Sequence, residues 1–140
     1  MNRPLLVTSL LAAFTACVHI FVGTPEIATP LLNSSLALEV SFLLYACWHL
    51  VSVVLAFSAV AFFVSALPRY IQPARMLALF VSWLWLAFGA VFVVVDLFGA
   101  DGTLLFKLPQ WTLLLPVGII GLFGCAQARR LSIATGKKAR

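Results

Sequence analysis

The run FLLYACWHLVSVVLAFSAVAFFVSAL, residues 42–67, carries no charged side chain and only one histidine, His49. It exceeds the roughly 20 residues that a helix needs to cross the hydrocarbon core of a bilayer. The run therefore predicts a membrane-spanning helix. It also raises a question about His49, because an imidazole inside a span is costly unless something pairs with it.

The composition of the whole chain agrees with this interpretation. Of its 140 residues, 64% are hydrophobic and 9% are charged, whereas soluble domains carry about a quarter charged residues. A soluble fold of this length could not bury so much apolar surface. We therefore expect one compact domain whose solvent is a lipid bilayer.

Three further apolar runs follow the same pattern, at about 5–22, 76–98 and 111–126. Together the four runs predict an all-α integral membrane protein, a four-transmembrane-helix bundle within residues 1–128. The expected helices cover about 5–23, 38–67, 75–99 and 110–128, and a basic cytoplasmic tail occupies 129–140. Pro25 and Pro30 are expected to end the first helix, since proline breaks the helical hydrogen-bond ladder.

Basic and acidic residues occupy different connections between the expected helices. The basic ones gather at the N-terminus, around the 68–75 connection and in the tail, with Lys107 as the exception, whereas the acidic ones lie in or beside the other two connections. This is the positive-inside pattern. It predicts a multi-pass protein of the cell inner membrane with both termini cytoplasmic. The net charge of +5 then reflects topology, and no nucleic-acid partner is expected.

The N-terminus also permits a different interpretation. Arg3 and the apolar residues after it resemble a secretory signal, and FTAC, ending at Cys17, is close to a lipoprotein cleavage box. The sequence after Cys17 stays apolar, however, whereas a mature lipoprotein usually begins with polar residues. We therefore expect this segment to remain as the first helix.

Each expected helix has a stripe of small or polar residues at helical spacing, which is typical of membrane helices that pack on one another. The stripes are expected to face inward. They comprise Thr8, Ala12, Thr15, His19, Gly23 and Glu26; Ser41, Tyr45, Trp48/His49, Ser52 and Ala56; Ser82, Trp85, Gly89, Phe92 and Asp96; and Gly118, Gly121, Gly124 and Cys125.

The candidate site lies in the outer half of the bundle, where the few ionisable residues of the spans occur. His49 is expected to lie deeper than His19 by about 4 to 9 Å, with the smaller gap favoured by the length of its helix. Three roles for His49 remain open. It is a core residue hydrogen-bonded to Tyr45, Ser52 or a carbonyl; or a metal or haem ligand; or a group that binds the head of a quinone-like or lipid molecule. The expected metal ligands are His19, His49, Asp96 and Glu26, and the expected ligand-binding residues are His49, Tyr45, Trp48, Ser52 and Trp111.

The sequence lacks the motifs that several familiar chemistries require, so these chemistries are excluded. The three cysteines form no Cys-x-x-Cys pair, so disulfide exchange lacks its reactive dithiol. Two histidines allow one bis-histidine haem at most. No His-Glu-x-x-His, Gly-x-Ser-x-Gly or phosphate-binding glycine loop occurs. The cofactor therefore stays open between a transition metal and a single haem, and the sequence does not separate an enzyme from a binding protein.

Three segments, VHIFVGTPEIATPLL (18–32), YACWHLVSV (45–53) and LPQWTLLLPVG (108–118), together resemble uncharacterised small four-span inner-membrane proteins of bacteria. The resemblance implies this architecture and a bacterial origin, and it carries no activity. The function expected first is a binding or redox protein that uses the outward-facing His/Asp site. The alternatives are an accessory or assembly subunit of a larger membrane complex, with structural histidines, and then a small transporter that works as a homodimer.

Overall fold

The computed structural model describes residues 1–99 and 102–138, and every regular element in those ranges is helical. The four long helices are α1 (Arg3–Cys17), α3 (Leu38–Ala66), α4 (Arg75–Gly99) and α5 (Trp111–Lys138). From α1 the chain continues through two π-helical segments, η1 (Val18–Val22) and η2 (Thr24–Ala28), into the short α2 (Thr29–Leu32).

Four helical stretches are long and apolar enough to cross a membrane, which confirms the all-helical architecture and indicates a multi-pass membrane protein. These stretches are Arg3–Val22, Leu38–Ala66, Arg75–Gly99 and Trp111–Arg130.

The two prolines after the first span do not end its helix, contrary to the prediction. Pro25 lies in the first turn of η2, and Pro30 lies in the first turn of α2. Proline is tolerated in a first turn, because its missing N–H would lack a partner there anyway. The helical path therefore runs on to Leu32. α5 likewise continues through Arg129 to Lys138, where the sequence predicts a separate tail.

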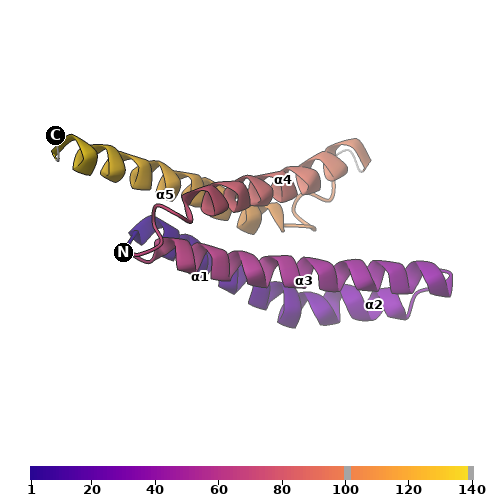
Figure 1. The fold of residues 1–140 in the computed structure, drawn as a ribbon. Helices are drawn as coiled ribbons and strands as arrows, with labels where there is room; N and C mark the ends of the chain where they lie inside the picture. Colours follow the sequence, from indigo (N-terminus) through magenta and orange to yellow (C-terminus); the bar gives the residue numbers. More distant parts are fainter. Residues whose placement is uncertain (100–101, 139–140) are drawn as a thin grey trace.

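The helices form two hairpins, α1 with α3 and α4 with α5, and α1 also packs on α5 (Figure 1). The N-terminus, the last turns of α5 and the 67–74 connection lie at one end of the molecule (Figure 1). We call this the basic end, since it carries Arg3, Arg69, Arg75, Arg129 and Arg130. The opposite end, with residues 24–37 and 102–110, is called the loop end.

The shared core lies toward the basic end. Phe62, Trp85 and Leu5, from three different helices, are fully buried there. Gly121 on α5 allows the closest approach, since a Cβ atom at this position would collide with Oγ of Ser82 and lie 3.2 Å from the Phe62 ring. Dispersion contacts of this kind are the main source of helix association in a membrane.

Asn2 ties three helices together at the basic end. Its side-chain oxygen caps α1 by accepting a hydrogen bond from the Leu5 amide at 3.2 Å. Its side-chain nitrogen donates to the Gly124 carbonyl of α5 at 2.9 Å, and its backbone amide donates to the Ala66 carbonyl of α3 at 2.9 Å. One residue thus satisfies groups at the ends of α1 and α3 and within α5.

The loop end is packed far less densely. On α3, Ser41 is the only buried residue before Leu55, and on α4, Asp96 is the only one after Gly89. The two hairpins draw apart toward this end (Figure 1), so their facing stripes lose contact. The inward prediction accordingly fails for Ala56 and Phe92, which are exposed.

Candidate functional site

His19 and Trp48 form the contact between the first and second spans at the loop end. Their rings are stacked, with centroids 3.9 Å apart and planes 20° from parallel. Nε2 of His19 lies 3.2 Å from the Trp48 carbonyl oxygen. A carbonyl can only accept a hydrogen bond, so Nε2 carries the proton and donates. Nε2 is therefore occupied, and a metal bound by His19 in this arrangement would have to use Nδ1.

The benzo ring of Trp48 also packs against Gly23. A Cβ atom at Gly23 would stand 2.6 Å from the indole Cη2, which is too close for any residue but glycine without a shift of the ring. Ser52 completes the contact, because its hydroxyl donates to the same Trp48 carbonyl at 3.1 Å. Packing therefore holds Trp48 in place, with His19 stacked on one face of its indole. A role for Trp48 in binding a ligand stays a prediction.

His49 has a different environment from His19. Its side chain is exposed, and its ring meets Tyr45 edge to face, with centroids 4.5 Å apart and planes at 84°. No hydrogen bond from the described residues reaches its imidazole nitrogens; the Ser52 hydroxyl is engaged with the Trp48 carbonyl. Within this chain, then, His49 is not the buried and hydrogen-bonded core residue that one of the three sequence interpretations expects.

The two histidines lie near one another along the first hairpin, since His19 stacks on Trp48, the residue before His49. Their relative depth in a membrane stays a prediction. His49 stands about 25 Å along α3 from Ala66, at 1.5 Å per residue. This distance is close to the thickness of a hydrocarbon core, about 30 Å, and aromatic residues such as Tyr45 and Trp48 are enriched at membrane interfaces.

Asp96 belongs to the other hairpin and has a structural role there. It is 3% exposed, and its Oδ1 accepts a hydrogen bond from the Leu104 amide at 2.8 Å. Its backbone carbonyl accepts one from the Gly102 amide at 3.3 Å. Asp96 thus folds the start of the α4–α5 connection back onto the end of α4. Its Oδ2 is buried without a hydrogen-bond partner beside an apolar pocket of about 280 Å³.

The remaining predicted site residues are dispersed. Glu26 is exposed on η2. The indole N–H of Trp111 donates to the Leu105 carbonyl at 2.9 Å, which fixes the connection before α5. Within residues 1–99 and 102–138, no three His, Cys, Asp or Glu side chains group closely enough to hold a metal ion. Metal or haem binding by His19, His49, Asp96 and Glu26 therefore stays a prediction.

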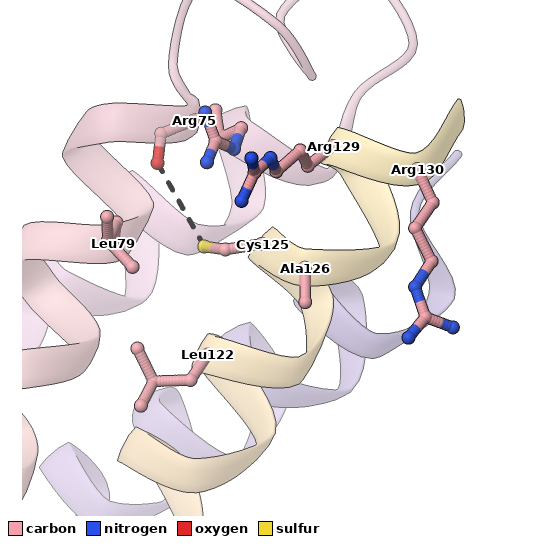
Figure 2. A pocket seen from close by; sticks show the side chains of 7 residues that line it. All are labelled: Arg75, Leu79, Leu122, Cys125, Ala126, Arg129 and Arg130. Carbon is pink, nitrogen blue, oxygen red and sulfur yellow. Dashed lines mark hydrogen bonds between the residues drawn. The ribbon is translucent and has the colours of Figure 1, made fainter. Parts of the chain in front are cut away.

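A second feature, at the basic end, does not follow from the sequence pattern. In that pattern Arg75 and Arg129 are only markers of topology, yet in the structure they line one pocket between α4 and α5 (Figure 2). The signal in the sequence was that each arginine ends an apolar span. The sequence pattern does not show which ends of the spans lie next to one another, because this depends on the tertiary structure.

Comparisons of this chain with protein-family models, with curated proteins and with solved structures found no match.

Proposed function

We propose that the protein is an accessory subunit of a larger membrane complex, which it binds through the tip of its first hairpin. This tip, residues 24–44, is called the apex. We place the protein in a bacterial inner membrane with both termini in the cytoplasm, on the positive-inside pattern. The apex then lies on the outer side of the membrane.

The observation that carries the proposal is the large amount of exposed apolar surface on the apex. Leu38 is 70% exposed and Leu43 is 64% exposed. The exposed large apolar residues of the apex are Ile27, Leu32, Leu36, Leu38, Val40, Phe42, Leu43 and Leu44.

The length of the first hairpin lifts much of this surface beyond the membrane. The 29 residues of α3 measure about 43 Å at 1.5 Å per residue, against a hydrocarbon core of about 30 Å. An ordinary tilt of about 20° shortens the span by only a few ångströms. Contiguous apolar surface outside the hydrocarbon is typical of an interaction site.

Site-specific photo-crosslinking in native membranes tests this function. A crosslinker at position 43 is expected to yield one discrete adduct with a membrane protein. A crosslinker at position 80 is the matched control, because Phe80 is 66% exposed and lies near the start of α4, on the other hairpin. The Leu38→Ser/Leu43→Ser double variant should abolish both the adduct and stoichiometric co-purification. Retention of the partner by the double variant, or the same adduct from position 80, would show that the apex is not the docking site.

A second candidate function is supported by His49. An exposed imidazole without a hydrogen-bond partner in the described chain, beside Tyr45 at the membrane edge, is suited to the polar head of a quinone-like or lipid molecule, or to a metal. An optical spectrum with metal and lipid analysis of the purified protein tests it. His49→Ala is expected to lose the bound species, whereas His19→Ala mainly lowers thermal stability. A wild-type protein that carries no such species would argue against this candidate.

A further inference from the structure

We propose that the chain binds the phosphate group of an anionic lipid in the pocket between α4 and α5 at the basic end. The lipid belongs to the leaflet on the side of the termini. This site lies at the end of the molecule opposite the apex and does not depend on the function proposed for the apex.

The pocket combines converging positive charge with an apolar wall. Its volume is about 430 Å³. The guanidinium groups of Arg75, at the start of α4, and Arg129, on α5, point toward one another (Figure 2). Arg130 also lines the pocket, but its side chain points away from the other two (Figure 2).

Neither guanidinium has an anionic partner in the described residues. Nε of Arg75 is buried without any hydrogen-bond partner. The described acidic residues, Glu26, Glu39 and Asp96, all lie toward the loop end of the molecule. Two facing guanidiniums repel each other, and an anion between them removes this repulsion. Arginine is well suited to the task, because its planar fork of N–H donors matches phosphate oxygens.

The backbone around the pocket is held in place. The Gln72 side chain donates to the Ala128 carbonyl at 3.0 Å, which ties the 67–74 connection to α5. The Ser65 hydroxyl donates to the Ala61 carbonyl of its own helix at 2.7 Å, and its oxygen lies 3.3 Å from the Ala74 carbonyl oxygen. The Cys125 thiol donates to the Arg75 carbonyl at 3.9 Å, a weak bond drawn as the dashed line in Figure 2. The site is thus largely formed before a ligand arrives, which lowers the entropic cost of binding.

The apolar wall favours a lipid over free phosphate. Leu79 lies one turn beyond Arg75 along α4, and Leu122 lies two turns before Arg129 along α5; both line the pocket. These residues lead from the arginines into the candidate spans, so an acyl chain can follow them while the headgroup stays with the guanidiniums. Basic pockets between membrane helices at this level are suited to anionic headgroups.

Native mass spectrometry of the full chain in detergent, titrated with phosphatidylglycerol or phosphatidylcholine, tests the proposal. We expect phosphatidylglycerol to bind preferentially, with one lipid retained per chain. Arg75→Gln/Arg129→Gln should weaken this binding at least about tenfold, given the contribution of each basic residue near a lipid surface. Arg69→Gln is the matched control, since Arg69 is exposed on the neighbouring 67–74 connection. Its guanidinium carbon lies 5.7 Å from the centroid of the Tyr70 ring. The Arg69→Gln variant should bind as the wild type does.

A second variant separates the lipid from free phosphate and guards against misfolding of the charge variant. Leu122→Trp keeps both arginines but fills the apolar wall. It should lose phosphatidylglycerol, and inorganic phosphate alone should not raise the melting temperature of the wild type as the lipid does. Equal stabilisation by inorganic phosphate, unchanged lipid binding by Leu122→Trp, or equal losses in the Arg69 and Arg75/Arg129 variants would each overturn the lipid site.

Discussion

At the basic end the two hairpins share one core, whereas at the loop end they separate and little of α3 and α4 is buried. The residues at the two ends are similar in kind, since both have small and aromatic side chains at helical spacing. The difference lies in how closely the helices approach at the basic end, where a Cβ atom at Gly124 would lie 3.1 Å from the Leu5 amide nitrogen and Asn2 bonds to the Gly124 carbonyl. The basic end is therefore expected to supply most of the stability, whereas the loop end leaves more of its helix surface exposed. The following substitutions test this difference between the two ends.

The largest effect is expected from the core of the basic end. Phe62→Ala removes a fully buried ring and should lower the free energy of unfolding by about 3 kcal/mol or more, the usual range for buried phenylalanine. Phe63→Ala is the adjacent control, because Phe63 is 48% exposed, and it should have little effect. Thermal unfolding of both variants in one detergent is the measurement. Similar losses in the two variants would contradict the assignment of the core.

Asn2→Ala is expected to come next. The substitution removes the cap of α1 and the side-chain hydrogen bond to the Gly124 carbonyl of α5, which together contribute about 2 kcal/mol. Asn33→Ala is the matched control at the loop end, where the Asn33 side chain donates to the Thr29 carbonyl in an exposed position. Chemical or thermal unfolding should separate the two. If Asn33→Ala were the more damaging, the loop end would have to be the more stable one.

Asp96 gives a smaller and more informative effect. Asp96→Ala leaves the Leu104 amide without an acceptor and should cost about 1–2 kcal/mol. Asp96→Asn keeps an oxygen for that amide and should cost much less. Stability measured for both variants distinguishes a structural carboxylate from a charged site. Equal losses would mean that the negative charge itself is needed, as it would be in a cation site.

The smallest global effect is expected at the contact between Gly23 and Trp48. Gly23→Ala pushes a Cβ atom into the indole and should loosen the first hairpin locally while the shared core stays intact. Hydrogen exchange of residues 18–32 should rise, and the melting temperature should change little. Gly99→Ala is the control, because a Cβ atom at Gly99 meets nothing within 4 Å. Unchanged exchange in Gly23→Ala would show that the indole can move aside freely.

The sequence predicts the four spans well, because length and composition alone define them. It also predicts the inward positions of Ser82, Trp85 and Gly89, which are buried, where the helices do pack together. The same periodicity wrongly predicts that Phe92 is buried. A stripe shows which face of a helix packs on a neighbouring helix, but it does not show how far along the helix that contact extends.

The candidate site was less predictable for the same reason. The pairing of His19 with Trp48 depends on the depth of α3, and the exposure of His49 depends on the separation of the hairpins. Local sequence rules also misjudge Pro25 and Pro30, because they assume that a helix broken at a proline cannot restart in the same direction.

The tandem π-helical segments make the first hairpin tolerant of changes in chain length. A π-turn holds about one residue more than an α-turn. Deleting one residue within 18–22 can therefore be absorbed by a return to α-helical geometry, with the side chains on both sides keeping their faces. The same deletion inside α1 would turn everything beyond it by about 100°. Evolution can thus remove a residue from this segment without disturbing the core at the basic end.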